Sequence, residues 1–409
     1  MPKIPRQPDI NIGTAGHVDH GKSTIVDAIT GVWTSAHSEE LRRGITIKVG
    51  YADAAFYKCP DCPSPQNHST LPKCPNCKAT GKIQRVVSFI DVPGHESLMA
   101  NMLSGSALTD GAVLAIAANE KVPQPQTREH LLALEMLGSK QMVIAHNKVD
   151  LVGAEEAKKN YESIMEFISG TVAEKAPIIP ISAQHNLNID ALIEAIELNI
   201  GTVTKDQSAP PLLQVLRSFD INKPGSTIEK LNGGVFGGSL SQGLLKIEDE
   251  VEIRPGVPND KSGKYEPVMT SISSLGTGAG LMDSVKPGGL VAIGTRLDPS
   301  LTKSDSFVGA VIGHPGELPP ILESLDMEVT LFDVAIGSPD MMKVEKIKHG
   351  EPLRLNVGTS VTMGLVSSVR DGHVSVNLRR PVSANSGSRL AISRRIAERW
   401  RLIGSGILS

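Results

Sequence analysis

A short segment near the start of the chain has the composition of a phosphate-binding loop. Residues 16–23, GHVDHGKS, match the pattern G-x-x-x-x-G-K-[ST] and lie between an apolar run and a helical stretch. In such a loop the backbone N–H groups and the helix N-terminus point at one phosphate chain. The Lys22 ammonium can neutralise the terminal oxygens, and the Ser23 hydroxyl can ligate Mg²⁺. The segment therefore predicts a nucleotide phosphate site, and the alternative is a glycine-rich turn that serves packing alone.

Two further polar motifs each follow an apolar run. Asp91, in the sequence DVPG, can reach Mg²⁺ through water, and the N–H of Gly94 can sense a γ-phosphate. In the sequence NKVD at residues 147–150, the Asp150 carboxylate can accept both N–H groups on the Watson–Crick edge of guanine. Adenine offers no such pair of donors, so binding it would lose charged hydrogen bonds worth about 1.5–3 kcal/mol each. This motif predicts selection of GTP over ATP.

A fourth motif, Ser182-Ala183-Gln184, follows the last apolar run and can offer backbone N–H groups to the guanine oxygen. Four motifs in this order, each at the carboxyl end of a strand, define one crevice of an open α/β sheet. We assign to nucleotide binding Val18, Asp19, His20, Gly21, Lys22, Ser23, Thr24, Gly94, Asn147, Lys148, Asp150, Ser182, Ala183 and Gln184. The Asp19 carboxylate could also approach Mg²⁺ or a second cation, and an exposed loop acid is the equal alternative.

All four cysteines lie in one window, as two C-x-x-C pairs separated by eleven residues: Cys59, Cys62, Cys74 and Cys77. Four thiolates at this spacing can surround one tetrahedral Zn²⁺. Because they leave no ligand position open, we expect a structural metal around which the insertion folds. Paired disulfides are the alternative, and they are disfavoured in an unexported protein whose thiols stay reduced.

Length and composition set the frame for these motifs. A chain of 409 residues with 40% hydrophobic and 21% charged residues and a net charge of −3 is typical of globular proteins of two or three domains. No apolar run reaches the roughly 18 to 20 residues that cross a bilayer, and the start carries no apolar export signal, so we expect a cytoplasmic protein without a membrane partner. Aromatic residues make up only 3%, which disfavours base-stacking platforms as the main means of binding nucleic acid.

Local charge is uneven despite the near-neutral total. Residues 379–401 hold seven arginines against one acid, a net charge of +6. This stretch could contact an RNA backbone, in which case binding should depend on salt. A solvated or ion-paired face of a β-domain is the equal alternative.

The pattern of apolar runs changes along the chain. Up to about residue 200, short apolar strands alternate with amphipathic stretches, which predicts a doubly wound, mostly parallel sheet covered by helices. The expected strands are Ile10–Ile12, Val86–Ile90, Ala112–Ala117, Met142–Ala145 and Ile178–Ile181, and the expected helices cover Thr127–Leu137, Glu155–Ile168 and Ile189–Ile200. From Leu212 onward, strands punctuated by glycine predict β-barrels. We predict three domains, at residues 1–205 with an insertion at about 57–82, 206–322 and 323–409.

With these motifs in place, residues 1 to about 200 resemble the G domain of translational GTPases, the family of elongation factor Tu. The segment Arg43 to Ile47 is similar to the first switch of that family, which implies that Thr46 closes on Mg²⁺, with Gly44 beside it. The segment Asp91 to His95 is similar to the second switch, which implies that His95 orients the attacking water as the catalytic residue. The resemblance thus implies a slow GTPase in which Gly44 and Thr46 join Ser23, Asp91 and Asp19 as candidate Mg²⁺ ligands.

Several features narrow the resemblance to one branch. The cysteine insertion, the sequence PQPQTREH at residues 123–130, the sequence RSFDINKPG at 217–225, the sequence KPGGLVAIGT at 286–295 and the arginine-rich end are similar to the gamma-subunit family of archaeal and eukaryotic translation initiation factor two. The short segment before the first strand favours an archaeal member. The resemblance implies a GTPase domain followed by two β-barrels. It also implies that the chain carries methionylated initiator tRNA to the small ribosomal subunit, together with alpha and beta subunits.

Two alternatives stay open at this point. An elongation-type or selenocysteine-specific carrier of aminoacyl-tRNA would share the nucleotide motifs, although the zinc insertion and the barrel motifs argue against it. A non-catalytic scaffold that uses GTP as a structural ligand is disfavoured by the complete set of nucleotide motifs and by His95.

Overall fold

The computed structural model of the chain describes residues 4–34, 49–95, 98–223, 225, 227, 231–259, 261–335, 342–396 and 399–409. The chain folds as two compact units, Met1–Val203 and Thr204–Ser409. The predicted first switch, with Gly44 and Thr46, lies outside the described residues.

The described part of the first unit is built around a seven-stranded sheet in the order β3-β2-β4-β1-β5-β6-β7. Its strands are β1 (Ile10–Ala15), β2 (Gly50–Lys58), β3 (His68–Ser69), β4 (Lys82–Asp91), β5 (Gly111–Ala117), β6 (Met142–Asn147) and β7 (Ile178–Pro180). The five strands β4, β1, β5, β6 and β7 pair in parallel, while β2 and β3 form an antiparallel edge. The mostly parallel sheet predicted from the apolar runs is confirmed.

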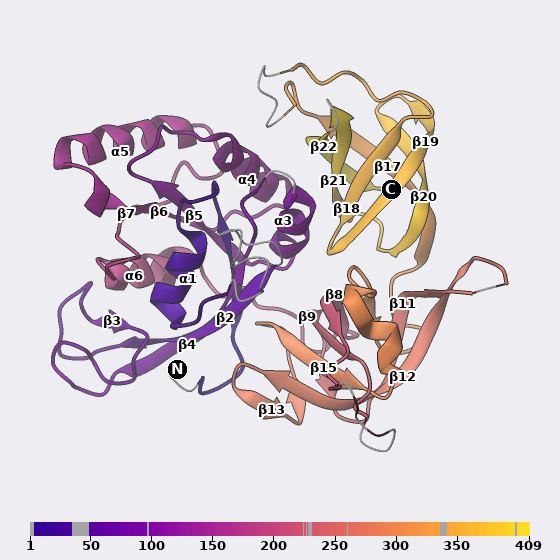
Figure 1. The fold of residues 1–409 in the computed structure, drawn as a ribbon, viewed down its shortest axis with the longest axis horizontal. Coiled ribbons are helices and arrows are strands. Elements are labelled where there is room, and N and C mark those ends of the chain that lie inside the picture. Colours follow the sequence, from indigo (N-terminus) through magenta and orange to yellow (C-terminus); the bar gives the residue numbers. More distant parts are fainter. Residues whose placement is uncertain are drawn as a thin grey trace. The chain divides into compact units, whose positions relative to one another are not determined.

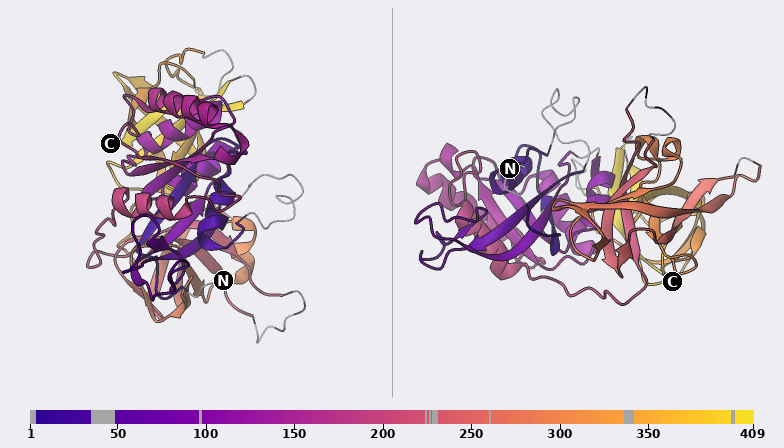
Figure 2. Two further views of the ribbon diagram at one scale, coloured as in Figure 1. Left: turned by 90° about the vertical axis from the view of Figure 1, so that its left-hand side faces the viewer. Right: turned by 90° about the horizontal axis from the view of Figure 1, so that it is seen from below.

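Helices cover both faces of this sheet, as the ribbon views show (Figures 1 and 2). The helices are α1 (Lys22–Thr30), α3 (Met99–Ser106), α4 (Pro125–Met136), α5 (Ala154–Ile168) and α6 (Ile189–Asn199). Side chains of α1 and α6 join one apolar core, and side chains of α4 and α5 join a second core on the other face. Strands β1 and β5 are buried along their whole length because they are covered from both sides.

The second unit holds two closed barrels. In the first, the described residues form β8 (Leu212–Phe219), β9 (Val235–Gln242), β11 (Glu250–Pro258), β12 (Tyr265–Thr277), β15 (Val291–Thr295) and β16 (Val311–Gly313). Pairing of β11 with β12 closes the ring. The second barrel is formed by β17 (Ile321–Leu331), β18 (Pro352–Val357), β19 (Ser360–Arg370), β20 (His373–Ser383), β21 (Arg389–Ile396) and β22 (Arg399–Leu408). The predicted order of one GTPase-type sheet and two barrels is confirmed.

Each barrel has its own apolar core. Along β19 buried and exposed residues alternate for most of its length, as expected when one face of a strand points into a barrel. Phe236 and Phe307 meet edge to face in the first barrel, with ring centroids 5.4 Å apart. Other buried positions of both cores are mostly aliphatic, which accords with the low aromatic content of the chain.

Candidate functional site

The phosphate-loop motif lies between β1 and α1, where the sequence placed it. Gly16 has a φ of 128°, and a Cβ there would approach the carbonyl oxygen of Ala115 to 2.3 Å. Gly21 has a φ of 85°, and its Cβ would approach Nδ2 of Asn147 to 2.3 Å. Both positions therefore require glycine, because the backbone conformation and the close approach exclude a side chain.

The Lys22 side chain folds back along the loop. Its Nζ donates to the carbonyl oxygens of Gly16 at 3.0 Å and His17 at 2.7 Å. Burial lowers the pKa of Lys22 to about 8, and the carboxylate of Asp91 opposes this shift. A phosphate chain in the loop would give this buried ammonium an anionic partner, so the donor set fits a nucleotide phosphate.

Asp91 ends β4 at the centre of a cluster of oxygen atoms. Ser23 Oγ donates to its Oδ2 at 2.6 Å, and Thr14 Oγ1 donates to its Oδ1 at 2.9 Å. Thr34 Oγ1 donates to Oδ2 at 2.6 Å. A carboxylate beside hydroxyl groups is the hard oxygen donor set that Mg²⁺ prefers, so these residues fit this ion.

The second predicted switch starts at Asp91. A Cβ on Gly94 would lie 2.3 Å from Lys22 Nζ and 3.1 Å from the backbone nitrogen of Val18, so Gly94 packs against the phosphate loop. His95 follows with an exposed side chain. The structure thus brings Lys22, Ser23, Asp91 and Gly94 together, whereas the partners predicted from the first switch fall outside the described residues.

Asn147, at the end of β6, connects two of the predicted motifs. Its Nδ2 donates to the carbonyl oxygen of His20 at 3.0 Å, and its Oδ1 accepts from the backbone N–H of Ala183 at 3.0 Å. The side chain is buried, with a relative exposure of 2% for the residue. A single amide therefore fixes the distance between the phosphate loop and the loop at residues 182–184.

Asp150 follows on the same loop, after Lys148 in the left-handed conformation with a φ of 63°. The nearby Ser182 hydroxyl lowers the pKa of Asp150, with a smaller contribution from His185, whose Nε2 is 3.6 Å from Oδ2. The carboxylate is therefore ionised at neutral pH and can accept hydrogen bonds. This is the protonation state that recognition of two guanine N–H donors requires.

Several residues around the site were missed by sequence reasoning. Thr14 and Thr34 donate to Asp91 across 77 and 57 residues of sequence, and no local pattern marks them. His130 accepts a hydrogen bond from the phosphate loop. Its position at the end of the segment 123–130 supports the family resemblance but predicts no contact with the phosphate loop.

The four cysteines gather in the insertion between β2 and β4. Their Sγ atoms all lie within 4.8 Å of one another, with 3.4 Å between Cys59 and Cys77 and 3.6 Å between Cys62 and Cys74. A disulfide needs about 2.05 Å, while the edge of a tetrahedron with Zn–S bonds of about 2.3 Å is roughly 3.8 Å. The donor set fits a tetrahedral zinc ion.

The insertion is attached to the helix that follows the guanine-side loop. Ser64 Oγ donates to Oε1 of Glu194 on α6 at 2.5 Å, and Nδ1 of the buried His68 is 3.8 Å from the same carboxylate oxygen. Figure 1 shows β3 and the surrounding loops at the edge of the sheet. The cysteine cluster therefore belongs to a docked part of the first unit.

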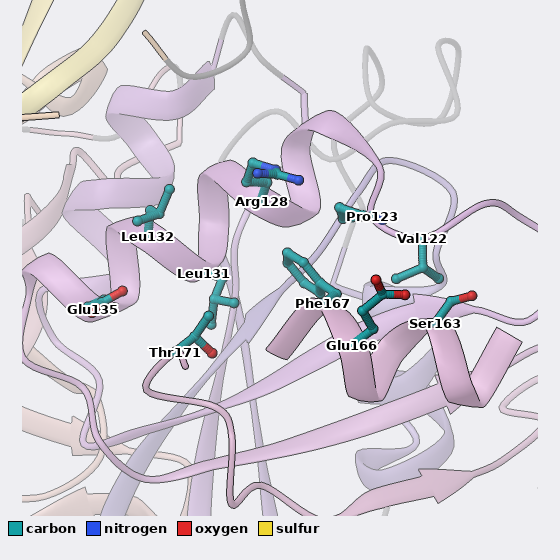
Figure 3. Close-up of a pocket in the computed structure, with 10 residues that line it drawn as sticks. All are labelled: Val122, Pro123, Arg128, Leu131, Leu132, Glu135, Ser163, Glu166, Phe167 and Thr171. Atoms are coloured by element: carbon teal, nitrogen blue, oxygen red, sulfur yellow. The ribbon is translucent and has the colours of Figure 1, made fainter. Parts of the chain in front are cut away.

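A separate pocket of about 530 Å³ lies between α4 and α5 (Figure 3). Its walls combine apolar and charged side chains: Val122, Pro123, Arg128, Leu131, Leu132, Glu135, Ser163, Glu166, Phe167 and Thr171. None of the residues predicted to bind nucleotide or metal lines it. The pocket is therefore distinct from the nucleotide crevice.

The arginine-rich stretch of the second barrel is partly engaged within the protein. Arg394 forms an ion pair with Glu351 and donates to the carbonyl oxygen of Glu345 at 2.8 Å. Arg380 donates to the carbonyl oxygen of Ser306 at 3.2 Å, and Arg401 is buried, with 7% exposure. The net charge of this stretch therefore overstates the basic surface that is open to a partner.

Comparison with known proteins agrees with the geometry of the site. Residues 7–202 match the family described as the elongation factor Tu GTP binding domain. In overall fold the chain is similar to a bacterial selenocysteine-specific elongation factor, with a TM-score of 0.74 and 23% identity over 98% of this chain and 58% of that longer chain. It is also similar to elongation factor SelB of Methanococcus maripaludis, with a TM-score of 0.72 and 20% identity over 99% of this chain and 80% of that chain. The protein is a translational GTPase.

The second unit, together with relatives that match the chain over its whole length, identifies the family within the translational GTPases. Residues 323–408 match the family described as initiation factor eIF2 gamma, C terminal. Translation initiation factor 2 subunit gamma of Archaeoglobus fulgidus is 57% identical over 408 residues, covering 100% of this chain and 96% of that protein. The same subunit of Pyrococcus abyssi is 56% identical over 405 residues, with 98% of both chains covered. The chain belongs to the family of translation initiation factor 2 gamma subunits.

Among the described residues, no helix combines the length and the apolar composition that crossing a bilayer requires.

Proposed function

We propose that this chain binds GTP and Mg²⁺, carries methionylated initiator tRNA to the small ribosomal subunit, and hydrolyses GTP when the start codon is recognised. The observation that carries the proposal is the bridge formed by Asn147 between the phosphate loop and the loop at residues 182–184. It sets the phosphate motif and the guanine motif of one nucleotide at a fixed separation. Family membership supports the translational role.

In this proposal the chain contributes positioning and charge neutralisation, since a loose phosphoryl-transfer transition state needs little covalent chemistry. The backbone of residues 18–24 and the Lys22 ammonium hold the phosphates, with Gly94 at the γ-phosphate. Lys148, Asp150 and residues 182–184 hold the guanine. Ser23, Asp91, Asp19, Gly44 and Thr46 are the proposed Mg²⁺ ligands, which would neutralise charge on the phosphate oxygens. His95 orients the attacking water.

The remaining parts of the proposal concern organisation and partners. Residues 1–205, 206–322 and 323–409 act as three domains, and Cys59, Cys62, Cys74 and Cys77 hold a structural zinc ion. Alpha and beta subunits of the same factor complete a cytoplasmic heterotrimer. The distances between the four Sγ atoms support the zinc ion, and membership of the gamma-subunit family supports the partner subunits.

The test is binding of charged initiator tRNA to the purified chain with GTP and with GDP, with and without the two partner subunits. We expect tighter binding with GTP, because a switch acts only if its two nucleotide states differ in their contacts to the partner. Equal affinity in both states would contradict the carrier role. Calorimetry with GTP and ATP in the presence of Mg²⁺ checks the nucleotide site separately.

His95 is tested by single-turnover hydrolysis. His95→Ala should lower the rate well below that of the wild-type protein while GTP affinity holds, because the side chain acts on the water and not on the nucleotide. An unchanged rate with the natural activator present would remove His95 from the mechanism. Comparing charged initiator tRNA with charged elongator tRNA distinguishes the initiation role from an elongation-type or selenocysteine-specific carrier.

A further inference from the structure

The first residue of the phosphate loop is held by a histidine from another element. The backbone N–H of Gly16 donates to Nδ1 of His130 on α4 at 3.0 Å. His130 is buried, with 1% exposure, and 114 residues of sequence separate the two partners. His130 itself lies outside the motifs that predict nucleotide binding.

The protonation state of His130 follows from this geometry. Nδ1 can accept a hydrogen bond only when it carries no proton, so the ring is neutral with its proton on Nε2. Burial lowers the pKa of His130 well below its usual value, and the nearby charges of Lys22, His17 and His20 act in the same direction. The imidazole therefore remains an acceptor throughout the neutral pH range.

The backbone of Gly16 is held from two further directions. Its carbonyl oxygen accepts from Lys22 Nζ at 3.0 Å, and its α-carbon packs so closely on β5 that a Cβ would lie 2.3 Å from the carbonyl oxygen of Ala115. With the N–H group fixed by His130, the two peptide units that flank the Gly16 α-carbon have little freedom to rotate. Gly16 is the first residue of the phosphate loop. Its backbone conformation therefore sets the direction in which the following N–H groups point toward the phosphates.

We propose that His130 is a positioning residue of the nucleotide site, whose unprotonated Nδ1 holds the N–H group of Gly16 so that the phosphate loop is preorganised for a guanosine di- or triphosphate. The inference rests on the proposed nucleotide site and adds a residue that touches no ligand. It also makes the position of the phosphate loop depend on the position of α4. Removing the acceptor leaves a buried N–H without a partner, and the loop must shift to satisfy it.

The test compares three variants of the full chain by stopped-flow dissociation of fluorescent GDP and GTP analogues in the presence of Mg²⁺. His130→Leu keeps the volume and removes the acceptor, so both nucleotides should dissociate about tenfold faster, as expected when a preorganised site loosens. His130→Asn places an amide oxygen near the position of Nδ1 and should stay within about threefold of the wild-type rate. Leu134→Val, a buried change in the core on the same helix, should lower the melting temperature and leave dissociation unchanged.

The outcomes separate the possible failures. If the wild-type chain binds no guanine nucleotide, the proposed function fails and not merely this inference. If His130→Leu folds and dissociates nucleotide within twofold of wild type, His130 serves packing alone and the inference is overturned. If His130→Leu does not fold, the protonation state of His130 Nδ1 is measured instead, from ¹⁵N spectra of the histidines in the wild-type protein. An unprotonated Nδ1 from pH 6 to 8 supports the contact, and a proton on Nδ1 overturns it.

Discussion

Replacing Asn147 by alanine removes the bridge between the phosphate loop and the guanine-side loop. The change deletes two hydrogen bonds of 3.0 Å and leaves the carbonyl of His20 and the N–H of Ala183 without this partner. Both residues are buried, with 1% and 4% exposure. A buried polar group that loses its partner costs about 1–3 kcal/mol, so the loss of both contacts should lower the free energy of unfolding by about 2–6 kcal/mol.

Urea denaturation of the nucleotide-free chain measures this change, with GTP affinity recorded in parallel. Asn199→Ala is the matched control, because that side chain is exposed and its amide donates to the carbonyl oxygen of Ala195 on the same helix. This variant should stay within about 0.5 kcal/mol of wild type. For Asn147→Ala we also expect GTP affinity to fall at least about tenfold, since both loops lose their common support. A loss of stability below about 1 kcal/mol together with unchanged GTP affinity would refute the bridging role.

Three further predictions concern the cysteines, a buried histidine and the second barrel. Protein purified without added zinc should contain one zinc ion per chain by metal analysis, Cys74→Ser should lose it, and a zinc content near zero with four titratable thiols would contradict the site. Burial lowers the pKa of His20 to about 4 from an ordinary value of 6.5. Below pH 6.5 this side chain therefore binds a proton in the unfolded chain but stays neutral in the folded chain. Protonation of His20 in the unfolded chain should lower the free energy of unfolding by about 2 kcal/mol when the pH falls from 7 to 5. In urea titrations His20→Gln should weaken the pH dependence of the free energy of unfolding. An equally steep pH dependence in the variant would show that other groups cause it. Arg394→Ala should lower the melting temperature more than Arg379→Ala, because it leaves Glu351 half-buried without its partner; equal melting temperatures would show that the ion pair contributes no stability.

Much of the fold and the motif positions could be predicted because the signals are local. Continuous apolar runs identified β1, β4, β5, β6 and β7, and each motif follows such a run directly. The antiparallel strand β2 was missed, because its sequence GYADAAFYK mixes buried and exposed positions without regular alternation. Propensity and periodicity indicate which structure a segment can form by itself. A strand such as β2 forms because a neighbouring strand pairs with it, which the local sequence does not show.

The contacts that support the site could not be predicted for a related reason. Thr34 and Asn147 act through partners that lie 57 and 127 residues away in sequence. Arg394 likewise pairs with Glu351, 43 residues earlier, so a local count of charges could not decide between an RNA contact and an ion-paired face. Only the three-dimensional structure brings the neutralising acid to the arginine.

The phosphate loop is held by side chains and backbone from three separate elements. Ala115 on β5 packs against Gly16, Asn147 at the end of β6 bonds the carbonyl of His20, and His130 on α4 accepts from the N–H of Gly16. Each contact acts on a backbone group, so the loop depends on these neighbours whatever side chains it carries. The octapeptide pattern therefore identifies a loop able to bind phosphate. Its preorganisation depends on residues that only the parallel sheet and its covering helix bring together.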